Sequence, residues 1–228
     1  MNQPRTENPR TSNLQLLQLS DSLFPIGAYA HSDGLEAAAA DGRIASPDDL
    51  REWIAVCLDQ TIGRLEGPAV WQAWRAACDG DVPALLALDE ELTALRPSSA
   101  ARASSRAMGH RLLTTWRALR SDARLAAIPR PVALPIAFAA AAACAGVERR
   151  AAVEAYAYTR LAATVSAAMR LLPIGQIEAH ALLARALERV PAAAERIAAR
   201  GGALESFAPA LDIAAMSQQY MRSRLFRS

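Results

Sequence analysis

Residues 99–127 read SAARASSRAMGHRLLTTWRALRSDARLAA, and this stretch has the clearest structural pattern in the chain. At 100° per residue, its apolar side chains gather on one side of a helix, whereas most basic side chains gather on the other. We therefore expect one long amphipathic helix that packs on a core and ends before Pro129. The apolar side holds Met108, Leu112, Trp116 and Leu119, and the basic side holds Arg102, Arg106, His110, Arg117, Arg120 and Arg124.

The composition extends this expectation to the whole chain. Of the 228 residues, 53 are alanine and only 5% are aromatic, so residues that favour helices far outnumber those that favour strands. No segment shows sustained alternation of apolar and polar residues. The hydrophobic content of 52% is enough to bury a core. The sequence thus predicts an all-α fold, a single-domain bundle of about eight to ten helices.

Glycine, proline and polar residues divide the chain into the expected helices. The linkers between them are short, which favours one all-helical domain over residues 12–218. A flexible arm is expected at residues 1–11 and an interaction tail at residues 219–228. The other helices are expected at about 12–22, 33–42, 67–79, 83–95, 132–145, 148–171, 176–190, 191–200 and 209–218, with one more that begins at Ser46.

Two of these helix starts carry a capping signature. Ser46 can cap a helix because Pro47 takes the first helical position and two aspartates follow in the first turn. Asp33 and Glu36 have the spacing of a capping box, in which two side chains accept backbone N–H groups at the start of a helix.

The absence of lysine excludes several classes of enzyme. All 25 basic residues are arginine. The chain therefore lacks the P-loop lysine of nucleotide triphosphatases and the Schiff-base lysine of pyridoxal enzymes. It also shows no catalytic Ser-His-Asp order and no carboxylate pair at a recognisable spacing. We expect a protein that is not an enzyme.

The cysteines and the apolar segments indicate a cytoplasmic protein. Cys57, Cys78 and Cys144 are odd in number and far apart, so we expect reduced residues within the core. The opening residues MNQPRTENPR are polar and do not resemble a signal peptide. The longest apolar run, residues 132–145, is too short to span a bilayer. We expect no association with a membrane.

The histidines do not form a recognisable metal site. None of His31, His110 and His180 has another histidine or a cysteine at a ligand spacing. His31 does have acidic neighbours in Asp33 and Glu36, and carboxylates can bind a metal together with imidazole. A stand-alone nickel carrier therefore stays open as an alternative, although one histidine and two acids do not define a closed site.

The net charge of +2 is unevenly distributed along the chain. Residues 31–95 sum to −9, residues 96–124 to +6 and residues 125–228 to +5. This polarity indicates either internal pairing or two surfaces for different macromolecules. The basic side of residues 99–127 is accordingly either a solvated or paired stripe or a partner-binding face. An arginine-rich nucleic-acid-binding regulator is a further alternative, although no aromatic residues are interleaved with these arginines.

The last nine residues, YMRSRLFRS, differ from an ordinary polar terminus. They carry Tyr220, Leu225 and Phe226 among three arginines, so burial of this segment would be favourable. The segment is expected to dock on its own domain, on a partner, or near a partner surface.

Four motifs in order resemble a known family. Residues 19–29, LSDSLFPIGAY, are followed by HSDGLE at residues 31–36. Further matches are RAMG at 106–109, RLLPIGQ at 170–176 and RLFRS at 224–228. The similarity covers most of the chain, which resembles the UreF family of urease accessory proteins.

The resemblance implies an all-helical, dimeric scaffold that is not an enzyme. Such proteins join UreD (also called UreH) and the GTPase UreG on apo-urease, and help to insert nickel at the carbamylated-lysine active site. A role in regulating the GTPase, or in passing nickel between proteins, is also implied. No cofactor is expected to bind tightly, since nickel is handled by the complex.

Partner contacts are expected on the tail and at the N-terminal corner. The tail candidates are assigned to the UreD side or to tail docking, because aromatic and arginine side chains dominate binding energy at interfaces. Tyr29 and Glu36 are expected to shape that surface or the UreG contact. The full set of candidate partner-binding residues is Tyr29, Glu36, Arg102, Arg106, Gln176, Tyr220, Arg224, Leu225 and Phe226.

Overall fold

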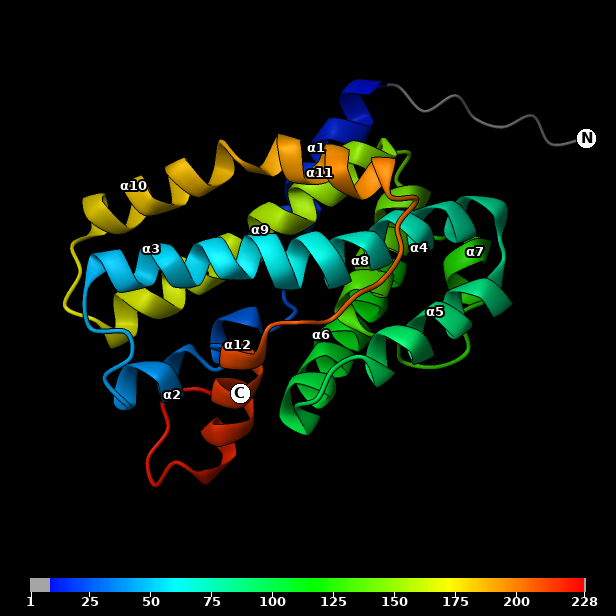
Figure 1. Ribbon diagram of the computed structural model, residues 1–228. Coiled ribbons are helices and arrows are strands. Elements are labelled where there is room, and N and C mark those ends of the chain that lie inside the picture. Colours follow the sequence, from blue (N-terminus) through cyan, green and yellow to red (C-terminus); the bar gives the residue numbers. More distant parts are fainter. Residues whose placement is uncertain (1–8, 228) are drawn as a thin grey trace, which may run out of the picture.

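The computed structural model describes residues 9–227, and every regular element among them is helical (Figure 1). The predicted all-α fold is therefore confirmed. The helices are α1 (Pro9–Ser20), α2 (Leu35–Ala40), α3 (Pro47–Val56), α4 (Gly67–Asp79), α5 (Val82–Ala94), α6 (Ser99–Leu119), α7 (Ala123–Ala126), α8 (Leu134–Cys144), α9 (Arg149–Leu171), α10 (Gln176–Leu187), α11 (Val190–Ala199) and α12 (Pro209–Ser217), with the 3₁₀-helices η1 (Ala28–Ala30) and η3 (Gln218–Tyr220) and the π-helix η2 (Cys57–Glu66).

Helix α8 forms the centre of the larger of two apolar clusters. Its sequence, LPIAFAAAAAC, is apolar on all sides, and residues 134–143 are all buried, as expected for a helix surrounded by others. Its alanines let α4, α6 and α9 pack closely around it. Gly109 of α6 lies against the segment that leads into α8, where a Cβ atom would lie 2.2 Å from the carbonyl oxygen of Val132.

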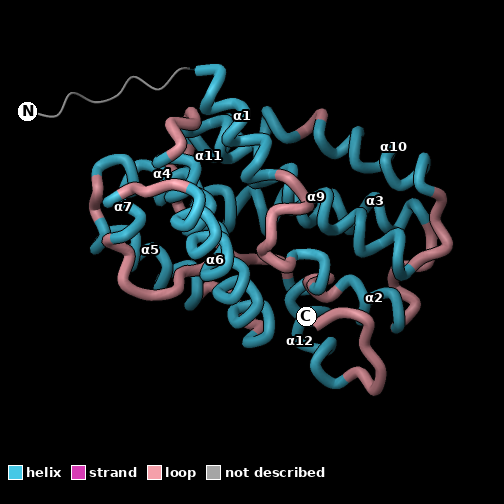
Figure 2. The backbone as a smooth tube through the Cα atoms, turned by 180° about the vertical axis from the view of Figure 1, so that it is seen from behind, coloured by secondary structure: helices cyan, strands magenta, loops and turns pink. Residues whose placement is uncertain are grey.

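Helix α9 connects this cluster with the second one. Its residues up to Tyr156 belong to the α8 cluster, and residues from Ala157 onward pack with α2, α3, α10, α11 and α12. Phe226 of the tail is part of the second cluster. The C-terminal segment, red in Figure 1, lies beside α2 and below α3, and Figure 2 shows the same arrangement from behind.

A π-helix joins α3 and α4, where we expected a break before a separate helix at 67–79. Pro68 has no N–H to donate to the carbonyl of Arg64, and in an α-helix its ring would clash with that carbonyl. The helix instead widens into a π-helix, in which Gly67 donates its N–H to the carbonyl of Ile62, five residues back. The freed carbonyl of Arg64 accepts the backbone N–H of Glu205 at 2.8 Å. This hydrogen bond holds the linker before α12, which contains Glu205, alongside η2.

The single helix expected over residues 99–127 is wrong in its last eight residues, 120–127. Helix α6 ends at Leu119, and Arg120 has the extended φ and ψ values of −144° and 118°. Asp122 then accepts the N–H of Arg124 and caps the short α7. Arg117 of α6 donates to the carbonyls of Leu125 and Ile128, and these hydrogen bonds hold the turn after α6 in place.

Two expectations about the N-terminal region also need correction. Helix α1 begins at Pro9, so the last three residues expected in the arm at 1–11 are helical, and residues 1–8 lie outside the described part of the chain. The capping box of Asp33 and Glu36 does not form, because Gly34 occupies the N-cap of α2 and the Oγ atom of Ser32 accepts the N–H of Glu36, at 3.5 Å. The cap at Ser46 is confirmed, and Asp49 completes a capping box there.

Two further observations concern the cysteines and the helix lengths. Cys57, Cys78 and Cys144 are free and partly buried. None of the described helices is both long enough and apolar enough to span a membrane.

Candidate partner-binding site

The turn before α2 lies directly against α12. Asp33 and Gly34 both adopt positive φ angles, of 50° and 89°. A Cβ atom at Gly34 would lie 2.5 Å from the backbone nitrogen of Ala215, so only glycine permits this contact. The N-terminal motif therefore positions the C-terminal helix by backbone packing.

Glu36 fixes the tail through hydrogen bonds. Its side chain is buried and accepts the backbone N–H groups of Leu225 and Phe226, the latter at 3.1 Å. The Nε2 atom of Gln218 donates to the same carboxylate at 3.1 Å. These donors compensate for the desolvation of the buried charge. Glu36 is thus an internal anchor of the tail and is not placed to touch a partner.

Gln218 joins this anchor to the turn before α2. Its Oε1 atom accepts the Oγ–H of Ser32 and the N–H of Gly34, both at 3.1 Å. One buried amide therefore contacts the N-terminal turn with its oxygen and Glu36 with its nitrogen. The turn before α2 and the C-terminal tail therefore form one hydrogen-bonded unit.

Phe226 is buried under the same unit. The guanidinium of Arg170 lies 4.3 Å from the centre of its ring, and the Nη1 atom of that arginine donates to the carbonyl of Tyr29 at 2.7 Å. The backbone N–H of Arg227 donates to the carbonyl of Ala30 at 2.8 Å. In this structure, Phe226 therefore docks on its own domain, which is one of the expected alternatives.

The outer surface of this unit is aromatic and basic. The side chains of Tyr29 and Tyr220 are 76% and 81% exposed, and Leu225 is 54% exposed. The exposed side chains of Arg222 and Arg224 have no hydrogen bond or ion pair with the described residues. Exposed tyrosine and arginine side chains are typical of binding surfaces. We call this surface, formed by Tyr29, Tyr220, Arg222, Arg224 and Leu225, the terminal surface.

The remaining candidate residues lie apart from the terminal surface. Arg102 donates to the carbonyls of Arg96 and Pro97, at the start of its own helix. Arg106 lies 3.5 Å from the buried carboxylate of Asp89. Gln176 is exposed at the start of α10, and its side chain has no hydrogen bond with the described residues.

The basic stripe of residues 99–127 is largely occupied within the molecule. Arg117 binds two carbonyls of the turn that follows α6, as described above. Arg120 lies over the ring of Trp116, and Arg124 pairs with Asp122 at 2.7 Å. The sequence left open whether this stripe is solvated, paired internally or bound to a partner. In the structure, most of its arginines are paired within the molecule.

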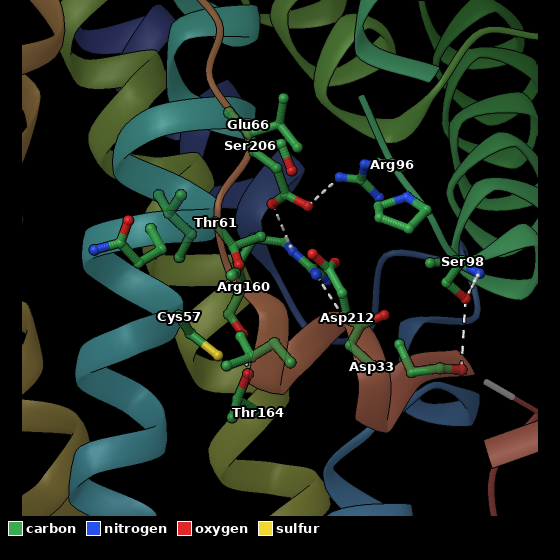
Figure 3. Close-up of a pocket in the computed structure, with 18 of the residues that line it drawn as sticks. Asp33, Cys57, Thr61, Glu66, Arg96, Ser98, Arg160, Thr164, Ser206 and Asp212 are labelled. Atoms are coloured by element: carbon green, nitrogen blue, oxygen red, sulfur yellow. Dashed lines mark hydrogen bonds and ion pairs between the residues drawn. The ribbon is translucent and has the colours of Figure 1, made fainter. Parts of the chain in front are cut away.

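A buried charge network, which the sequence did not reveal, lies under the N-terminal turn (Figure 3). Arg160 of α9 pairs with Asp33 and with Glu66 of η2, and Arg96 also pairs with Glu66. Tyr156 donates its hydroxyl to the same glutamate at 2.9 Å. Burial alone raises the pKa of Asp33, but the charge and hydrogen bond of Arg160, together with the charges of Arg96 and His31, outweigh burial, so the net pKa is lowered. The network connects the turn before α2, the π-helix η2, the segment between α5 and α6, and helix α9.

The described residues hold no group of three histidine, cysteine, aspartate or glutamate side chains that could bind a metal. His31 is partly buried, which lowers its pKa, whereas His110 and His180 are exposed. The candidate site therefore consists of helical surfaces and of the hydrogen bonds that connect the turn before α2 with the C-terminal tail.

These features define an all-helical protein with a surface that is built from both ends of its sequence. The family model described as UreF matches residues 44–187, more than half of the chain. The chain belongs to the UreF family of urease accessory proteins.

Similar proteins cover almost the whole chain. The urease accessory protein UreF of Azoarcus sp. (strain BH72) is 36% identical over 223 residues, which span 94% of this chain and 95% of that protein. UreF of Azorhizobium caulinodans is 36% identical over 212 residues, or 90% of each chain. UreF of Dechloromonas aromatica is 36% identical over 220 residues, with 94% and 96% covered. The likeness therefore extends beyond the residues that the family model matches.

Proposed function

We propose that this chain is a scaffold for urease maturation that makes and breaks no bonds itself. It links UreD (UreH) and the GTPase UreG on apo-urease, supports nickel insertion and modulates GTP hydrolysis. It acts in the cytoplasm as a homodimer, without tightly bound nickel of its own. Membership of the UreF family supports this role, since the similar proteins are named urease accessory proteins.

The terminal surface is the observation that carries the proposal. It combines exposed tyrosines with arginines that no described residue pairs with, and it is held in place by the buried Glu36. Tyr220, Arg224 and Leu225 form the proposed contact with UreD, and Tyr29 lies beside them or takes part in the contact with UreG. Glu36 and Phe226 act indirectly, because both are buried and hold this surface in place.

Co-purification with UreD and UreG tests the proposal. A double variant Tyr220→Ala and Leu225→Ala removes exposed apolar area, so the fold should be retained and the yield of the complex should fall. Leu14→Ala on α1 is the matched control, because Leu14 is 67% exposed but lies on another helix. A complex that survives both the double variant and deletion of residues 220–228 would remove the tail from the proposal.

The isolated chain should bind neither nickel nor nucleic acid tightly. Equilibrium dialysis should give no stoichiometric nickel binding that His31→Ala abolishes. Duplex DNA should not retain the chain with steep salt dependence, because most arginines of the basic stripe are paired internally. Either form of tight binding would favour the corresponding alternative function.

A further inference from the structure

A cavity of about 80 Å³ lies beside the buried charge network, and no residue of the terminal surface lines it. The π-helix η2 forms one side of it, and the linker and α12 form the other (Figure 3). Stretches of π-helix in proteins are frequently found at functional sites. The cavity is open to solvent, and Phe207, which is 74% exposed, lies among its lining residues.

The charges around this cavity do not balance. Two arginines, Arg96 and Arg160, are matched by two acids, Glu66 and Asp33, with which they form ion pairs. Asp212 of α12 also lines the cavity, and its carboxylate has no hydrogen bond or ion pair with the described residues. If all five groups are ionised, the cavity carries one uncompensated negative charge. A cation would neutralise this charge, whereas an anion would double it.

The walls between these charges are apolar. Trp53, Ile62 and Leu211 line the cavity together with Phe207. An alkyl chain can lie along such walls, while a charged group at its end reaches a carboxylate. A planar guanidinium can also stack on an aromatic ring such as that of Phe207.

We propose that this cavity binds an arginine side chain of a partner protein, with its guanidinium at Asp212 and its alkyl stem along Ile62 and Leu211. The geometry combines one unpaired carboxylate with an apolar channel and an exposed ring at the entrance. The inference relies on the proposed scaffold function only in taking the arginine from a partner.

The pH dependence of binding follows from the groups that face the cavity. Burial raises the pKa of Asp212, and the nearby charge of Arg96 lowers it by less. The other groups there are Asp33, Glu66, Arg160 and Cys57. Burial raises the pKa of the Cys57 thiol to about 12, so it stays neutral. Binding should weaken as the pH falls through the raised pKa of Asp212, before the paired Asp33 is protonated.

A capped amino acid tests the site on the isolated full chain. Nα-acetyl-arginine-N-methylamide is titrated into the protein and followed by NMR, with the corresponding citrulline compound as a neutral control of the same shape. We expect saturable shifts for Leu211 and Phe207 with the arginine probe, and binding at least about tenfold weaker with the citrulline probe. Equal binding of the two probes, or no saturable binding of the arginine probe, would overturn the proposal.

Two variants assign the effect to the cavity. Asp212→Asn should weaken binding of the arginine probe about tenfold, because it removes the unpaired charge. Glu91→Gln removes an exposed charge outside the cavity and should leave binding unchanged. Phe207→Ala should weaken binding without affecting the fold, because Phe207 is mostly exposed. Wild-type affinity in Asp212→Asn would overturn the proposal.

The source of the arginine is tested in the assembled complex. Asp212→Asn should lower the yield of the complex with UreD or UreG, relative to Glu91→Gln. A normal yield, together with probe binding, would overturn the assignment to a partner. If the wild-type chain forms no complex at all, the proposed function fails, whereas the probe titration still decides whether the cavity binds arginine.

Discussion

The carboxylate of Glu36 accepts the backbone N–H of Phe226 at 3.1 Å, although 190 residues of sequence separate the two. Leu225 and Gln218 provide the other N–H donors. Glu36 is buried and forms no ion pair with the described residues, so hydrogen bonds alone stabilise its charge. The position of the tail therefore depends strongly on one side chain.

Replacement of Glu36 by glutamine should release the tail. The amide retains one acceptor oxygen and turns an NH₂ group toward N–H donors, which should cost about 1.5–3 kcal/mol of unfolding free energy. Hydrogen exchange of residues 218–227 should accelerate, and trypsin should cleave faster after Arg222. Glu91→Gln is the control for loss of one carboxylate. Unchanged protection of the tail would contradict the role of Glu36 as its anchor.

A comparison of two glycines isolates the contact between α2 and α12. Gly34 and Gly42 both have positive φ angles, but a Cβ atom at Gly42 would have open space around it. Gly42→Ala should therefore cost only the backbone strain, about 1–2 kcal/mol. Gly34→Ala should lower the free energy of unfolding by about 1–3 kcal/mol more, since its methyl group meets the backbone of Ala215. Urea unfolding measures both, and equal costs would show that α12 moves aside freely.

The buried Asp89 should be more important for stability than its exposed neighbour Glu90. Asp89 accepts the N–H of Ala133 at 2.7 Å and pairs with Arg130 at 2.9 Å. Asp89→Asn leaves these donors poorly satisfied and should cost about 3–5 kcal/mol. Glu90 also pairs with Arg130 but is mostly exposed, so Glu90→Gln should cost at most about 1 kcal/mol. Similar urea midpoints for the two variants would contradict this difference.

Asp33 should contribute to the loss of stability in acid. The pKa of Asp33 in the folded protein lies below the ordinary value of 3.8. Its contribution to the free energy of unfolding is therefore complete above that value and is lost as the pH falls through the folded pKa. The variant Asp33→Asn removes the titration, and asparagine tolerates the positive φ angle at this position. Urea midpoints measured from pH 7 to about 2.5 should therefore fall less steeply in the variant. Parallel curves would show that Asp33 does not titrate differently in the folded state.

Local patterns were sufficient for much of the helical fold. Ser46 caps α3 through Asp49, only three residues away, so the whole motif was present in a short stretch of sequence. A helix was likewise expected at residues 132–145, and α8 lies within those bounds. The break after α6 was missed because the apolar and basic periodicity continued past Arg120, whereas the cap at Asp122 is a local signal that could have indicated it.

The contacts that build the candidate site could not be predicted from local patterns. A separate helix was expected from residue 67, but the carbonyl of Arg64 that Pro68 frees accepts the N–H of Glu205, far along the chain. Arg160 was one arginine among many, and its burial depends on acids contributed by two other segments. Glu36 was interpreted as part of a capping box because its actual donors lie in the tail.

The long sequence separation between Glu36 and Phe226 has a kinetic consequence. Helices close contacts between neighbouring residues quickly, whereas a contact across 190 residues requires the closure of a large loop, which is entropically costly. The terminal surface should therefore be completed late in folding, after the core around α8 has formed. On partial unfolding it should be among the first regions to open, so binding competence would be lost before the helices themselves melt.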